Sequence, residues 1–85
     1  MEEEPKPVKI SDWDALIGLI RNTPEGSEFI YDAGYRTWIP RTVIKVAQDR
    51  NITLIIKWRG GPDITVKPTD DIDLTLWQIF LKDLL

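Results

Sequence analysis

The sequence contains no histidine and no cysteine, and only one of its 85 residues is methionine. Without cysteine the chain can form neither a disulfide nor a thiolate nucleophile, and without either residue type it cannot build the usual structural zinc site. The lack of histidine also removes the side chain that enzymes use most often as a general base. We therefore expect a non-enzymatic binding domain with no catalytic residues, no metal site and no cofactor.

Long hydrophobic runs are also missing. No segment approaches the roughly 18 consecutive apolar residues of a membrane-spanning helix. The chain starts Met-Glu-Glu-Glu, whereas a signal peptide starts with positive charge followed by an apolar stretch. These two features predict a cytoplasmic protein that does not associate with a membrane.

The residues that are present indicate one folded domain. The chain is 42% hydrophobic and 29% charged, which is typical of a globular protein, and its length suffices for a single hydrophobic core. Residues 1–10 are acidic and contain two prolines, so we expect a solvated tail, with or without a short strand at its end. Residues 11–85 are expected to form a single small α+β domain.

Two helices are predicted, one near each end of the domain. The first starts at Ser11, which with Asp14 forms a weak variant of a capping box, and it ends before Gly26. Its apolar residues have the spacing of one helical face: Trp13, Leu16, Ile17 and Ile20. The last helix starts at about Ile72, where three carboxylates suit the positive end of the helix dipole: Asp70, Asp71 and Asp73.

The segment between these helices is rich in β-branched residues and is divided by turn residues. Four runs in it favour strands: Glu28–Ala33, Thr37–Gln48, Ile52–Arg59 and Ile64–Lys67. Such runs, joined by short turns, predict a four-stranded antiparallel meander of order α-β-β-β-β-α with both helices on one face. A strongly curled sheet that resembles a small barrel is the alternative.

Alternation along the predicted strands separates apolar from basic side chains. Even-numbered residues such as Trp38, Ile44, Leu54 and Trp58 would face the core. The opposite face would then carry five cations: Arg41, Lys45, Lys57, Arg59 and Lys67. Residues 35–67 have a net charge of +5, whereas the whole chain has −3. We therefore predict that this sheet face contacts a nucleic-acid backbone, although solvated strands often carry such residues for solubility alone.

The last helix offers a competing hypothesis. Between Leu74 and Leu85 the only polar residues are Thr75, Gln78, Lys82 and Asp83, so its apolar sector is wider than one contact with a sheet requires. Either the first helix or a second copy of the chain could cover the excess. A protein partner or a homodimer would then contact five residues: Trp77, Phe80, Leu81, Leu84 and Leu85. A third reading is an engineered domain without an evolved function.

Motifs for metal or phosphate chemistry are incomplete. In the segment from Asp63 to Lys67, Thr65 occupies the position where a metal-dependent nuclease would need a second carboxylate. The three aspartates before the last helix are followed by no calcium-binding loop, so capping is their favoured role. Gly60-Gly61 also lacks the Lys-Ser/Thr ending of a phosphate-binding loop.

Overall fold

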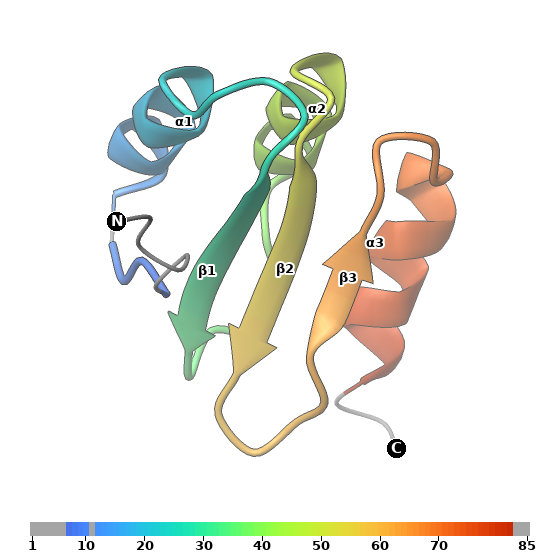
Figure 1. The fold of residues 1–85 in the computed structure, drawn as a ribbon. Helices are drawn as coiled ribbons and strands as arrows, with labels where there is room; N and C mark the ends of the chain where they lie inside the picture. The colour runs from blue at the N-terminus through green and yellow to red at the C-terminus, as the bar shows by residue number, and fades with distance from the viewer. Residues whose placement is uncertain (1–6, 11, 83–85) are drawn as a thin grey trace.

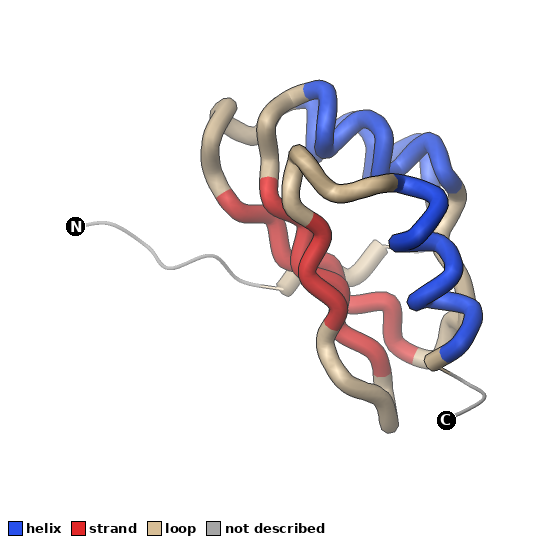
Figure 2. Tube along the Cα trace, turned by 90° about the vertical axis from the view of Figure 1, so that its right-hand side faces the viewer, coloured by secondary structure: helices blue, strands red, loops and turns tan. Residues whose placement is uncertain are grey.

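The computed structural model describes residues 7–10 and 12–82. In this part of the chain it has three helices and three strands, in the order α1 (Trp13–Arg21), β1 (Glu28–Gly34), α2 (Arg41–Asp49), β2 (Thr53–Trp58), β3 (Ile64–Val66) and α3 (Ile72–Leu81). The sheet has the order β1-β2-β3, as Figure 1 shows, with β1 parallel and β3 antiparallel to β2. Figure 2 shows two layers, because the helices lie on one side of the sheet and leave the other side open.

The predicted four-stranded antiparallel meander with two helices is wrong, and so is the barrel alternative. The described strands form an open three-stranded mixed sheet, and the predicted strand Thr37–Gln48 contains helix α2 instead. Its β-branched residues favour a strand locally. The helix forms nevertheless, because its turns bury one continuous stripe, made of Val43, Ile44 and Ala47, against the rest of the protein.

Pro40 provides the start of α2. It occupies the N-cap position, with the extended backbone that precedes a helix. Proline suits the start of a helix because the first helical N–H groups have no partner within the helix. Pro40 also interrupts the predicted strand Thr37–Gln48, because proline cannot donate a ladder hydrogen bond.

Helix α2 determines that β1 and β2 run parallel. Parallel neighbours need a long crossover connection, and the segment between β1 and β2 supplies one through α2. In the resulting register Phe29 lies opposite Leu54 and Tyr31 opposite Ile56. A strand in place of α2 would have allowed only hairpin connections between neighbouring strands. Predicting a strand here therefore led to the incorrect antiparallel sheet.

The core lies between the sheet and the helices. The predicted alternation is confirmed in β2 and the residue before it, because Ile52, Leu54, Ile56 and Trp58 are all buried. Helix α1 contributes Leu16 and Ile20 to the same core. Trp38, which was predicted to be buried, is exposed because it lies in the loop before α2 rather than in a strand.

The N-terminal region adds one bridge to the sheet and one helix cap. The backbone of Val8 pairs with β1 through hydrogen bonds of 2.9 Å to Ile30 and to Asp32. The N-cap of α1 is Asp12, whose Oδ1 accepts a 3.0 Å hydrogen bond from the Asp14 N–H. The predicted cap Ser11 and most of the predicted tail lie outside the described residues. Within the described ranges, no helix has both the length and the apolar character to cross a bilayer.

Candidate functional site

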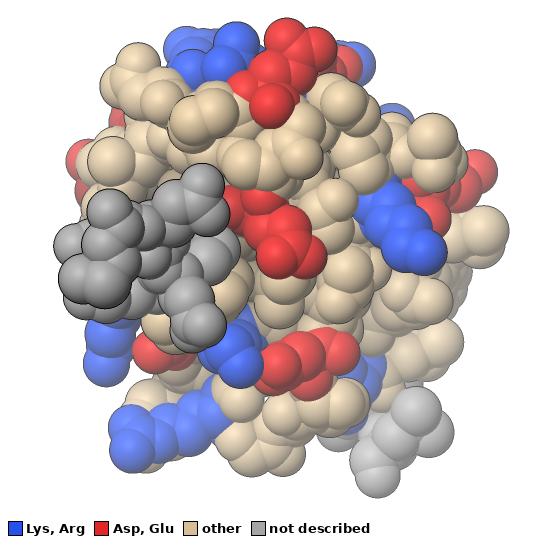
Figure 3. All heavy atoms as spheres, in the orientation of Figure 1, with Lys and Arg blue, Asp and Glu red and all other residues tan. Residues whose placement is uncertain are grey.

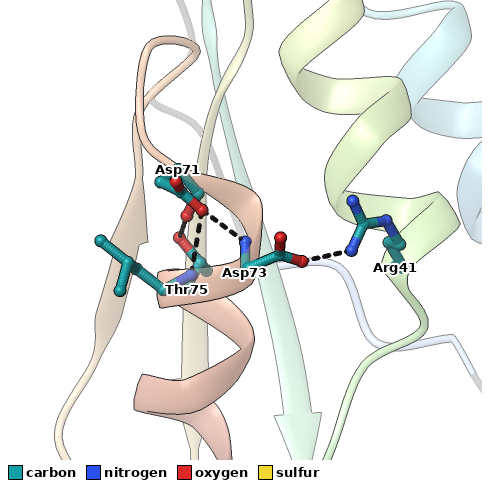
Figure 4. A network of polar contacts seen from close by, with 5 residues as sticks. Arg41, Asp71, Asp73 and Thr75 are labelled. Carbon is teal, nitrogen blue, oxygen red and sulfur yellow. Dashed lines mark hydrogen bonds and ion pairs between the residues drawn. The ribbon is translucent and has the colours of Figure 1, made fainter.

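Helix α3 is held at its start by an aspartate cap. Asp71 Oδ1 accepts hydrogen bonds from the backbone N–H groups of Asp73 at 2.8 Å and Leu74 at 3.2 Å. The Thr75 hydroxyl donates to the Asp71 carbonyl oxygen at 3.0 Å, as Figure 4 shows. The predicted capping role of this acidic segment is therefore confirmed, and residues 7–10 and 12–82 contain no acidic cluster suited to a metal ion.

An ion pair places α3 beside α2. Arg41, the first residue of α2, pairs with Asp73 in the first turn of α3 (Figure 4). Gln48 Nε2 adds a 2.8 Å hydrogen bond to the carbonyl oxygen of Asp70, just before α3. Helix α2 thus lies between α1 and α3, as Figure 1 shows, and α1 does not cover the outer side of α3.

The two sides of α3 differ in exposure, although both carry apolar residues. Thr75 and Ile79 are buried towards the protein interior. The outer side carries four exposed residues, which we call the α3 face: Leu74 (64% exposed), Trp77 (60%), Phe80 (60%) and Leu81 (41%). At 100° per residue these four positions span about 120° of the helix, opposite the buried side.

Two aromatic rings form the centre of the α3 face. Trp77 and Phe80 pack edge to face, with ring centroids 5.8 Å apart and planes at 88°. An open hollow of about 570 Å³ lies beside them and is lined by Asp73, Leu76, Trp77 and Phe80. The α3 face thus combines a packed aromatic pair with a depression next to it.

The structure brings together three of the five residues that were predicted for a protein partner. Trp77, Phe80 and Leu81 are all on the α3 face, whereas Leu84 and Leu85 lie outside the described residues. Sequence reasoning did not assign Leu74 to the contact set. Its spacing of three residues from Trp77 and seven from Leu81, which places all three on one helix side, is the signal that identifies it.

The predicted basic sheet face does not form as one surface. Arg41 and Lys45 belong to α2 in the helical layer, whereas Lys57 is in β2 and Arg59 follows it. Lys67 follows β3, and because β3 runs antiparallel to β2 it lies at the opposite end of the sheet from Arg59. The five cations are therefore divided between two layers and two ends.

Carboxylates also neutralise several of these cations. Lys45 pairs with Asp49 at 3.6 Å and Lys57 with Asp63 at 3.0 Å, in addition to the pair of Arg41 with Asp73. Figure 3, which looks onto the open side of the sheet, shows acidic groups among the basic ones. Among residues 7–10 and 12–82, the five cations predicted for a nucleic-acid backbone therefore do not form one uniform surface on the sheet.

The geometry thus favours α3 over the sheet as the candidate site. Comparison of the chain with known protein families, curated proteins and solved structures found no match.

Proposed function

We propose that this chain is a small non-enzymatic binding domain that associates with a second copy of itself through the α3 face. The observation that carries the proposal is the exposed aromatic pair of Trp77 and Phe80 at the centre of that face. Exposed apolar patches of this kind mark interaction surfaces, and aromatic side chains contribute much of the binding energy there. Covering them removes apolar surface from water, which drives association.

Symmetry favours a second copy as the partner. The α3 face is one apolar patch on a single helix. In a two-fold symmetric dimer the same patch packs against itself. Two antiparallel α3 helices would also place their dipoles in opposite directions, which is a favourable arrangement.

The size of the α3 face predicts a weak dimer. A fully covered aromatic side chain buries about 150–250 Å², so four partly exposed side chains supply a few hundred Å². A standard stable interface buries about 800 Å² per partner. We therefore expect a dissociation constant on the order of tens of micromolar, with exchange between monomer and dimer rather than an obligate assembly.

Sedimentation equilibrium between about 10 µM and about 1 mM protein tests the proposal directly, because a dimer of this affinity forms within that range. The average mass should rise towards twice that of the monomer. Trp77→Gln should keep the protein monomeric throughout, because it replaces an anchor ring with a polar amide. Thermal unfolding of each variant checks that the fold is retained.

Two leucines provide a matched comparison. Leu81 on the α3 face is 41% exposed and Leu19 on α1 is 40% exposed, so the same change to glutamine removes a similar apolar surface at each position. Leu81→Gln should weaken association severalfold, whereas Leu19→Gln should not change it. A wild-type protein that stays monomeric at about 1 mM, or equal effects of the two leucine variants, would contradict the proposal.

A further inference from the structure

A second surface lies where β1 and β2 end. Because these strands are parallel, their carboxyl ends meet at the same edge of the sheet, below the arrowheads in Figure 1. A bulge between Asp32 and Gly34 ends β1, and Gly34 has a positive φ of 59°, which glycine adopts without strain. The Asp32 carboxylate accepts a 2.9 Å hydrogen bond from the Gly34 N–H and holds this turn. The chain then leaves the sheet with Tyr35 exposed.

Two exposed aromatic rings follow the end of β1, and two arginines stack on rings beside them. Tyr35 is 79% exposed and Trp38 is 58% exposed. The Arg59 guanidinium lies 5.0 Å from the centre of the Tyr35 ring, and the Arg36 guanidinium lies 4.2 Å from the ring of Trp13, which itself packs against Trp38 at 6.0 Å. Each exposed ring is thus supported by a neighbour and still offers surface for stacking.

Positive charge gathers around the Tyr35 ring. Adjoining hollows at this edge are lined by five cationic residues, Lys9, Arg36, Lys57, Arg59 and Lys82, and by one carboxylate, Asp32. Lys57 is also paired with Asp63. Figure 3 shows Lys and Arg side chains near the lower end of the sheet face. This concentration occurs in a chain whose net charge is −3, so it is a local property of the edge.

One buried polar atom at this edge has no partner in the described chain. The indole N–H of Trp58 finds no hydrogen-bond acceptor among the residues that the structure describes, and Trp58 is only 7% exposed. Trp58 lines two of the same hollows, where its ring lies 4.0 Å from Lys82 Nζ. Because an indole N–H can only donate, an oxygen of an anionic ligand would satisfy it.

We propose that this edge binds single-stranded nucleic acid, and we call its residues the edge cluster: Tyr35, Arg36, Trp38, Lys57 and Arg59. Unpaired bases stack on the exposed rings of Tyr35 and Trp38, while the cations contact the phosphates between them. A duplex would keep its bases stacked inside, and a simple inorganic anion would leave the rings unused. Only Lys57 and Arg59 are shared with the five cations predicted from sequence.

Fluorescence anisotropy of a labelled oligothymidylate of about 12 nucleotides tests this inference at low and at raised salt. Tyr35→Ala, which removes a ring but no charge, should weaken binding about tenfold. Arg59→Ala should weaken binding at low salt and reduce the salt dependence by about one phosphate contact. Lys45→Ala removes the same charge from α2 and should leave affinity unchanged.

Three results would overturn the inference. The first is no binding at about 50 mM salt, where phosphate contacts are strongest. The second is an equal loss for Arg59→Ala and Lys45→Ala, since that indicates general charge attraction. The third is an unchanged affinity for Tyr35→Ala, which indicates a polyanion site without base stacking. Trp77→Gln should not alter oligonucleotide binding by the monomer, so this test can fail independently of self-association.

Discussion

Arg41 and Asp73 form an ion pair that joins the first turn of α2 to the first turn of α3 (Figure 4). Both side chains remain largely exposed, at 55% and 70%. The sequence assigned Arg41 to a basic strand and Asp73 to a helix start, with no indication that the two would meet. Asp73 also lines the hollow beside Trp77 and Phe80, so the pair lies next to the α3 face.

The exposure of this pair predicts a small contribution to stability. Arg41→Gln and Asp73→Asn should each lower the free energy of unfolding by less than about 1 kcal/mol, because solvent and salt screen surface ion pairs. Urea unfolding of both single variants and the double variant measures the coupling between them. A coupling energy well above about 1 kcal/mol would show that the pair is much less screened than its exposure indicates.

The Asp71 cap should matter more than an ordinary surface carboxylate. Asp71→Ala removes the acceptor of two backbone N–H groups at the start of α3, so we expect a loss of about 1 kcal/mol. Asp49→Ala is the control, because Asp49 ends α2 and forms an exposed pair with Lys45. Equal losses in urea unfolding would argue against the cap.

Two valines of α2 distinguish the helix from the predicted strand. Val43 is completely buried, whereas Val46 is half-buried. The strand interpretation would place Val46 in the core and Val43 on the open face. In the helix, Val43→Ala should cost roughly 2 kcal/mol and Val46→Ala clearly less, because the first leaves a cavity in the core. The opposite order in chemical unfolding would support the strand.

Tyr31 predicts how stability depends on alkaline pH. Burial raises the pKa of its phenol above 10.0, and the nearby Arg36 partly offsets this effect. Above pH 10 the unfolded chain releases the phenol proton while the folded protein still retains it, so rising pH favours unfolding. This contribution to stability is complete below pH 10 and is lost as pH rises through the folded-state pKa.

The matching variant is Tyr31→Phe, which keeps the ring and removes the ionisable group. The Tyr31 hydroxyl donates a long hydrogen bond of 3.4 Å to the Ile10 carbonyl oxygen and also interacts with Arg36, so the cost near neutral pH should be about 1 kcal/mol. Between pH 9 and 11 the free energy of unfolding of the variant should fall less steeply than that of the wild type. Parallel slopes would show that Tyr31 does not contribute to the alkaline dependence.

The elements that sequence predicted well have local signals that agree with their environment. Helices α1 and α3 have apolar residues at helical spacing and aspartates at their starts, and β2 alternates strictly between buried and less buried positions. Helix α2 lacks this agreement, because its Thr, Val and Ile residues favour a strand while its buried stripe requires a helix. The burial of Val43, Ile44 and Ala47 outweighs the small propensity difference.

The candidate sites show the same division. The excess of apolar residues in the last helix was enough to predict Trp77, Phe80 and Leu81 as contact residues, and all three are exposed. The edge cluster could not be predicted, because Tyr35 and Arg59 are 24 positions apart and meet only if β1 and β2 run parallel. Nothing in the local pattern of either residue indicates the direction of the neighbouring strand.

The sequence by itself determined the absence of thiol and imidazole chemistry, the aspartate capping of α3 and the buried side of β2, since each depends on residue type or short-range spacing. Only the tertiary structure decided that residues 41–49 are helical. The parallel pairing of β1 and β2 and the separation of the five predicted cations both follow from that helix. The physical reason is that apolar burial is a property of the assembled layers. A segment with mixed local preferences adopts whichever backbone buries its apolar side chains best.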